Sequence, residues 1–364
     1  MAYPVRVLSD EEDAWHTLVH VCQRWRHVVF GSPHRLDLRL FCLNRRLMNT
    51  LDIWPELPIV VYVDDWGCHP MPSVTDVTLL NRHGRVCKLV INNIPNSFLK
   101  ELASMSSPFP ALITLDLTSF EHGPQILHDS FLGGSVPSLR SFSLWGIQFP
   151  AMGKLLLSTH DLVNLSLGFI PPSGFISPEA MVDILSALTK LKSFQLHFTR
   201  FESFGFWTHE ESQYPPVFER VVLPALTNFD YRGNSEYLEG IVSRIDAPLD
   251  CVAVTFTNQL TLSDVPSFRD FIRCTKIHNG PHRADTFFSK INVEMSFFQR
   301  KREPEVDFNV LNLRIPCSRC AIYSQLSLLA QACGTLLPRL PSLELLSLYN
   351  LDLWPSQWRM RWIT

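Results

Sequence analysis

Apolar and polar residues recur in one short pattern along much of this chain. A leucine that follows a proline or a turn is succeeded by apolar residues three and five positions further on, usually with a polar residue between the last two. Five such segments have a proline lead-in, and their first leucines are Leu112, Leu139, Leu226, Leu249 and Leu343. Two more segments, which begin at Leu162 and Leu191, lack the proline. The alternation predicts a β-strand with one buried face in each segment.

The spacing of these segments is that of a repeat protein. Segments start 23 to 29 residues apart at the first leucines Leu112, Leu139, Leu162 and Leu191. A leucine-rich repeat has a similar length, roughly 20–29 residues. Because a chain that is 46% apolar produces the three-position pattern by chance, the proline lead-in and the spacing carry this prediction. The series extends back to Val86/Leu89/Ile91, and two blurred candidates follow Leu249, namely Phe288/Ile291/Val293 and Phe308/Leu311/Leu313.

Amphipathic helices are predicted between the strands. Ser177-Pro178-Glu179 combines an N-cap residue, a proline at the first helical position and an acid in the first turn, which together mark a helix start. Asn234 precedes a second apolar stretch at helical spacing. Each strand and helix would bury its apolar face against the neighbouring units. The predicted fold is therefore an α/β leucine-rich-repeat solenoid, with a curved parallel sheet inside and helices outside.

The N-terminal residues follow a different pattern. Apolar residues recur there at helical spacing, and they predict an amphipathic helix that ends at Gly31-Ser32-Pro33. These apolar residues are Trp15, Leu18, Val19, Cys22, Trp25 and Val29. We therefore expect a helical segment at 1-33, a repeat region at 34-350 and a tryptophan-rich tail at 351-364. The tail repeats tryptophan at Trp354, Trp358 and Trp362. That stripe predicts either an exposed anchor for a partner or a cap over the last repeat.

Part of this N-terminal segment resembles a known family. The Val-Cys-x-x-Trp-Arg core of the run 10–26, formed by Val21, Cys22, Trp25 and Arg26, resembles the later part of an F-box. Three further stretches, at 52–55, 130–135 and 245–249, read Asp-Ile-Trp-Pro, Ser-Phe-Leu-Gly-Gly-Ser and Ile-Asp-Ala-Pro-Leu. They are similar to stretches in a large family of mushroom-type fungal F-box/leucine-rich-repeat proteins. The resemblance covers most of residues 10–350.

The resemblance implies a function in protein binding. In this family the F-box binds a Skp-type adaptor of a cullin–RING (SCF-type) ubiquitin ligase, and the repeats hold the protein substrate. The residues that match the F-box, and that the resemblance assigns to adaptor binding, are Leu18, Val21, Cys22 and Trp25. The family's opening Leu-Pro dipeptide and leucine-rich helix have no match in Met1–Leu8, so we expect an incomplete F-box and a chain truncated at both ends. The alternative is a leucine-rich-repeat scaffold, or a truncated F-box relic, without ligase association.

Composition and charge narrow the class of protein. The chain is 46% apolar and 18% charged, which is typical of a folded protein. Its formal charge of −3 gives no overall field that would hold nucleic acid or an anionic membrane. The nine scattered cysteines are explained best by reduced thiols. We therefore expect a cytoplasmic or nuclear protein without nucleic-acid or membrane partners.

Motifs of catalysis are missing from the sequence. Cys317-Ser318-Arg319-Cys320 is a lone C-x-x-C pair, and zinc requires four ligands. His209-Glu210 begins like a zinc-protease helix but lacks the second histidine. We expect no enzymatic activity, no cofactor and no bound metal.

The repeat pattern also predicts where a partner would bind. In a leucine-rich repeat, residues between the buried positions point from the strands onto the concave face. The candidates for partner binding there are Asp116, Trp145, His197, Asp230, Arg232 and Tyr349. Small polar residues surround them, among them Ser141, Ser143, Asn164, Ser166 and Ser193. Aromatic and arginine side chains are the usual energetic anchors of protein interfaces, so Trp145, Arg232 and Tyr349 are the strongest candidates.

Overall fold

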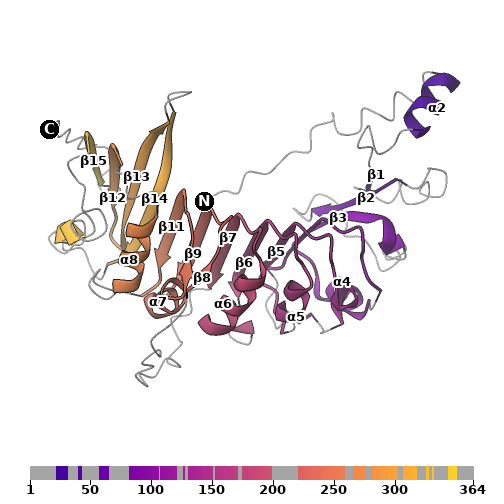
Figure 1. Cartoon of the computed structure of the whole chain (residues 1–364), viewed down its shortest axis with the longest axis horizontal. Coiled ribbons are helices and arrows are strands. Elements are labelled where there is room, and N and C mark those ends of the chain that lie inside the picture. Colours follow the sequence, from indigo (N-terminus) through magenta and orange to yellow (C-terminus); the bar gives the residue numbers. More distant parts are fainter. Residues whose placement is uncertain are drawn as a thin grey trace. The chain divides into compact units, whose positions relative to one another are not determined.

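The chain divides into two units, Met1–Leu139 and Arg140–Thr364. The computed structural model describes residues 22–31, 40–42, 57–64, 82–105, 107–120, 126–127, 130–150, 152–170, 174–198, 220–258, 265–275, 281–301, 306–317, 325–327, 330–331 and 343–350. Both units contain strands and helices (Figure 1). The protein is therefore mixed α/β with a mostly parallel sheet, as the hydrophobic pattern predicts.

The first unit contains four parallel strands in chain order. They are β1 (Leu40–Cys42), β2 (Ile59–Asp64), β3 (Val86–Asn92) and β4 (Thr114–Thr118). Helix α4 (Asn96–Ser104) and the short 3-10 helix η3 (Phe131–Gly134) contact each other. Helix α2 (Gln23–Gly31) belongs to the predicted N-terminal helix, whose first part, residues 15–21, lies outside the described residues. The early segment Val86/Leu89/Ile91 is confirmed as a strand with all three side chains buried.

The second unit begins with five parallel strands in chain order. They are β5 (Ser141–Trp145), β6 (Asn164–Ile170), β7 (Ser193–Phe198), β9 (Asn228–Gly233) and β11 (Cys251–Phe256). The helices between and after them are α5 (Met152–Leu157), α6 (Pro178–Ala187), α7 (Ser235–Val242) and α8 (Pro266–Cys274). Consecutive helices contact one another and lie along one side of the sheet (Figure 1). A separate short parallel pair joins β8 (Val221–Val222) to β10 (Ile245–Asp246).

The register of these five strands stacks equivalent apolar residues into rows. One row runs across the strands through Phe142, Leu165, Phe194, Phe229 and Val252, and every member is buried. Of the seven first leucines that define the pattern, six are buried and Leu343 is half-buried. Aromatic rings meet within the row, since the Phe194 and Phe229 ring centroids lie 5.8 Å apart. The repeated pattern therefore specifies the core of this part of the molecule.

The predicted helix starts are confirmed. The Ser177 hydroxyl accepts a hydrogen bond from the Ala180 backbone N–H at 3.2 Å, with Pro178 at the first position of α6. The Asn234 side chain accepts one from the Tyr237 N–H at 3.1 Å at the start of α7. Both caps satisfy backbone donors that a helix leaves without an internal partner.

The C-terminal part of the second unit departs from the predicted repeat. Its strands β12 (Arg283–Phe288), β13 (Asn292–Lys301) and β14 (Val306–Pro316) pair antiparallel with one another. Strand β14 lies parallel beside β11, and the final strand β15 (Leu345–Asn350) lies parallel beside β12. The strand order is therefore β11-β14-β13-β12-β15. The sheet is parallel only in part, and this differs from the fully parallel sheet that the pattern predicts.

The prediction that Phe288, Ile291 and Val293 belong to a single strand is wrong. Phe288 ends β12 and faces Val293 of β13 across the hairpin, while Ile291 lies in the turn and is 55% exposed. The Ser289 hydroxyl accepts a hydrogen bond from the Asn292 N–H at 3.1 Å and closes this turn. Spacing between apolar residues cannot distinguish one strand from a tight hairpin of two. The other candidate, Phe308/Leu311/Leu313, does lie on one strand, β14, with its two leucines buried.

Candidate functional site

Side chains between the buried positions of β5, β6, β7, β9 and β11 form a partly exposed surface, which we call the strand face. Its central row lies in register across these strands and consists of Ser143, Ser166, Gln195, Asp230 and Ala253. The neighbouring row towards the carboxyl ends of the strands contains Trp145, Gly168, His197, Arg232 and Thr255. The strand face therefore unites Trp145, His197, Asp230 and Arg232, four of the residues that the sequence predicts for partner binding.

Hydrogen bonds link the side chains of this face from strand to strand. The Trp145 indole Nε1 donates to Ser166 Oγ at 3.1 Å, and the Ser166 hydroxyl donates to Gln195 Oε1 at 2.8 Å. The Gln195 amide Nε2 donates to Asp230 Oδ2 at 3.0 Å. The other carboxylate oxygen, Oδ1, lies 3.0 Å from His197 Nε2. This chain of contacts holds five side chains in one arrangement before any partner arrives, which lowers the entropy cost of binding.

Trp145 lies on the predicted face but is less accessible than an interface anchor. Only 8% of the residue is exposed, because its ring packs over Gly168 and meets the Phe169 and His197 rings at 5.3 and 5.4 Å. A Cβ atom at position 168 would lie 2.3 Å from the Trp145 ring. Phe169 has a φ of 49° at an irregularity in the β6–β7 register, between Leu167 and Ile170. Trp145 therefore positions the hydrogen-bonded chain rather than reaching out to a partner.

Asp230 remains accessible even though both of its oxygens have partners. Its side chain is 42% exposed, whereas that of His197 is 16% exposed. The Asp230 charge also reaches Cys251 on the next strand. Burial raises the pKa of the Cys251 thiol, and the negative charges of Asp230 and Asp250 raise it further. This face therefore combines an accessible carboxylate with a thiol that stays protonated near neutral pH.

Arg232 stands beside His197 and Thr255 in the sheet register. Its guanidinium Nε is buried and has no hydrogen-bond partner in the part of the chain that the structure describes. A buried donor without an acceptor costs free energy in the unbound protein. Among the candidate residues, Arg232 is therefore the one for which a ligand that supplies a hydrogen-bond acceptor would be most favourable.

The two remaining candidates of the predicted face lie elsewhere. Asp116 is a half-buried residue of β4, in the first unit. Tyr349 is half-buried on β15, at the far edge of the second unit's sheet, where its ring stacks on Phe287 with centroids 4.7 Å apart.

Sequence reasoning missed two residues of this surface. Gln195 joins Ser166 to Asp230, and its position between Phe194 and Leu196 is the same repeat offset that places Ser166 on the face. Arg314 extends the row of Arg232 and Thr255 onto β14. The repeat offset was a sufficient signal for Gln195, whereas Arg314 follows from the strand order alone.

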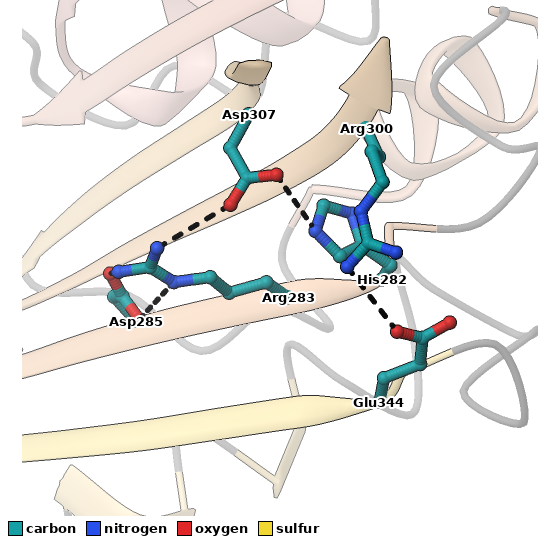
Figure 2. A network of polar contacts seen from close by, with 6 residues as sticks. All are labelled: His282, Arg283, Asp285, Arg300, Asp307 and Glu344. Carbon is teal, nitrogen blue, oxygen red and sulfur yellow. Dashed lines mark hydrogen bonds and ion pairs between the residues drawn. The ribbon is translucent and has the colours of Figure 1, made fainter. Parts of the chain in front are cut away.

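A second polar network joins the ends of the C-terminal strands (Figure 2). Arg283 donates from Nε and Nη2 to Asp285 at 3.0 and 2.5 Å, and its Nη1 lies 3.5 Å from Asp307. His282 Nε2 lies 3.0 Å from the other oxygen of Asp307. The pairing with Asp285 raises the pKa of Arg283, and the guanidinium lies 5.1 Å from the Phe298 ring centroid. The Asp285 side chain is only 7% exposed, so this network serves the stability of the hairpin.

The residues expected to bind an adaptor are described only in part. Cys22 and Trp25 are exposed, and Trp25, on α2, is 49% exposed. Leu18 and Val21 lie outside the described residues, as do Cys320 of the lone C-x-x-C pair and the tryptophan-rich tail. Within the described residues, no group of three or more metal-binding side chains occurs, and no helix is long and apolar enough to cross a membrane.

Comparison with known proteins gives no relative for this chain. No protein-family model, no curated protein and no solved structure matches it. The fold and the strand face together define a mixed α/β protein with a mostly parallel sheet and an ordered, partly exposed polar surface.

Proposed function

We propose that this chain is a protein-binding leucine-rich-repeat protein that acts as an F-box-type substrate receptor of a cullin–RING ubiquitin ligase. The strand face is the observation that carries the proposal. Its hydrogen-bonded side chains are fixed in advance by the packed Trp145 ring, and it brings Arg232 and the accessible Asp230 carboxylate to one surface. Arginine is one of the usual anchors of protein interfaces, and polar groups typically surround such anchors.

The repeat assignment has support from the arrangement of the strands. Strands β5, β6, β7, β9 and β11 follow one another in chain order, with parallel pairing and equivalent residues in register. Each repeat would bury its apolar face only against its neighbours, as in a solenoid. The antiparallel strands β12 to β14 would then be an insertion into the last part of the repeat array.

The ligase role rests on the F-box resemblance and on the surface of α2. This helix exposes Trp25 and Val28 by 49% and 55%, and Cys22 beside it is exposed too. Exposed apolar side chains that gather on one element are typical of an interaction site. In the proposed receptor, α2 binds the Skp-type adaptor while the strand face holds the substrate.

Co-purification with a fungal Skp-type adaptor tests this proposal. The full chain is compared with Trp25→Ala and with His27→Ala, which removes an exposed side chain from a different side of α2. We expect the parent and His27→Ala to capture the adaptor and Trp25→Ala to lose it, with all three folded by circular dichroism. A folded parent that captures no adaptor would refute the receptor role and favour the alternative, a repeat scaffold or F-box relic without a ligase.

A further inference from the structure

Two arginines stand on either side of one threonine in the sheet of the second unit. Thr255 of β11 pairs in register with Arg232 of β9 and with Arg314 of β14. Adjacent strands lie about 4.8 Å apart, so the two arginine backbones are separated by about 10 Å. An arginine side chain is long enough to reach halfway across that gap. Both guanidinium groups can therefore converge above the short side chain of Thr255.

Neither arginine has an acceptor among the residues that the structure describes, and the Nε of Arg232 is buried. Other arginines of this unit lie beside acidic residues, in the pairs Arg244–Glu179, Arg269–Asp270, Arg273–Asp270, Arg283–Asp285 and Arg300–Glu344. Arg232 and Arg314 are both half-buried, and the described residues supply no hydrogen-bond acceptor to either guanidinium group. Two guanidinium groups at this spacing favour an oxyanion as the ligand.

The nearest acidic side chains hold other partners. Asp230 lies on the same strand as Arg232, and its two carboxylate oxygens contact Gln195 and His197. Both of these partners are on β7, which lies on the other side of β9 from Thr255. Glu294 of β13 is in register with Arg314, and its Oε1 accepts a hydrogen bond from the Asn312 amide at 3.4 Å. Neither carboxylate therefore takes the place between the two arginines.

We propose that Arg232 and Arg314, with the Thr255 hydroxyl between them, bind an aspartate or glutamate side chain of the protein partner. This inference rests on the proposed function of the strand face and names the chemistry of the partner: an exposed acidic segment. A carboxylate takes two parallel hydrogen bonds from one guanidinium and leaves lone pairs for the second. Arg232 and Arg314 thereby determine the position of that segment on the strand face.

The charges around the subsite favour a carboxylate over a phosphate group. Asp230 lies two residues before Arg232 on β9, and Glu294 of β13 stands beyond Arg314 in the register. Their negative charges repel a doubly charged phosphate more strongly than a singly charged carboxylate.

Fluorescence anisotropy with labelled hexapeptides tests the subsite in the full chain. The probes are hexaglutamate, hexaglutamine and a hexapeptide of phosphoserine. We expect saturable binding of hexaglutamate alone, weakened about tenfold by Arg232→Gln and by Arg314→Gln, because each substitution removes a charge-assisted hydrogen-bonding group. The matched control is Arg140→Gln, since Arg140 is exposed and precedes β5. It should leave the affinity unchanged.

Three results would overturn the inference. They are the absence of saturable hexaglutamate binding to the folded chain, equal binding by both arginine variants and the parent, and tighter binding of the phosphoserine peptide. Adaptor capture is measured on the same preparations. Arginine-dependent hexaglutamate binding without adaptor capture supports the subsite and refutes the ligase role, whereas capture without such binding does the reverse.

Discussion

Within the second unit, strands β5, β6, β7 and β9 connect their polar side chains mainly through hydroxyl and amide groups, whereas strands β12 to β14 combine such hydrogen bonds with ion pairs. In the first region the contacts pass from one strand to the next, from Trp145 through Ser166 and Gln195 to Asp230. In the second region Arg283 binds Asp285 on its own strand and reaches across the Phe298 ring to Asp307 of β14. One region is an accessible polar surface, and the other contains a nearly buried carboxylate.

The difference follows from strand direction and burial. Parallel strands in register place equivalent positions side by side, so small polar residues at one repeat offset connect into a row along the strand face. The antiparallel hairpin brings together positions that have no common offset, and Asp285 is 7% exposed there. A buried carboxylate is costly unless it is paired or hydrogen-bonded, and Arg283 supplies both to Asp285. The parallel region is therefore suited to binding, and the hairpin region depends on its ion pair for stability.

The largest effect should come from breaking that ion pair. Arg283→Met leaves the Asp285 carboxylate buried without its main partner, and we expect a loss of about 3 kcal/mol in the free energy of unfolding. Urea denaturation measures it. The double variant with Asp285→Asn removes the buried charge as well and should recover most of the stability. A loss below about 1 kcal/mol, typical of an exposed pair, would contradict the contrast between the two regions.

The next effect tests the packing that orders the strand face. Gly168→Ala places a Cβ atom 2.3 Å from the Trp145 ring, and overpacking of this kind costs about 2 kcal/mol. The displaced indole should also release its hydrogen bond to Ser166. The matched control is Gly153→Ala in α5, where the nearest atom would be Ile184 Cδ1 at 3.7 Å. Thermal unfolding should show a lower midpoint for the first variant and no decrease for the second.

A smaller effect concerns the central link of the strand face. Gln195→Ala removes the amide that joins Ser166 to Asp230, and we expect a loss of about 1 kcal/mol in stability. In a double-mutant cycle with Ser166→Ala, the two losses should be coupled, since the side chains share a hydrogen bond. Additive losses in urea denaturation would mean that the cross-strand chain does not act as one unit.

The same contrast explains which parts of the molecule the sequence predicts. Leu165 and Leu167 could be assigned to a strand with one buried face, and Leu162 to the core just before it, from spacing alone, because parallel strands repeat one local pattern and the core requires it. The helix starts at Ser177 and Asn234 were predictable for a similar reason, since capping is local chemistry. The hairpin turn at Ser289 could not be predicted, because the spacing of apolar residues is the same across a tight turn as along a single strand. The proximity of Arg232 and Arg314 depends on β14 lying beside β11, which is a property of topology rather than of either strand.

The smallest effect compares a thiol of the strand face, Cys251 on β11, with Cys317, which follows β14. Burial raises the pKa of both Cys251 and Cys317, but the negative charges of Asp230 and Asp250 raise that of Cys251 as well. Asp230→Asn removes one of these charges, so the Cys251 pKa should fall and a larger fraction of the thiol should be ionised at a given pH. Because the thiolate is the reactive form, alkylation of Cys251 by iodoacetamide, followed by peptide mass spectrometry, should become faster between pH 7 and 9.

Cys317 provides the internal reference for this measurement, and its alkylation rate should not change in the Asp230→Asn variant. Asp183→Asn, an exposed substitution on α6, removes the same charge away from both cysteines and should affect neither rate. Equal acceleration at Cys251 and Cys317 would indicate a general loosening of the sheet. Acceleration at Cys251 alone would show that the Asp230 charge acts locally on the strand face, where the proposed partner's acidic segment must approach Arg232 beside it.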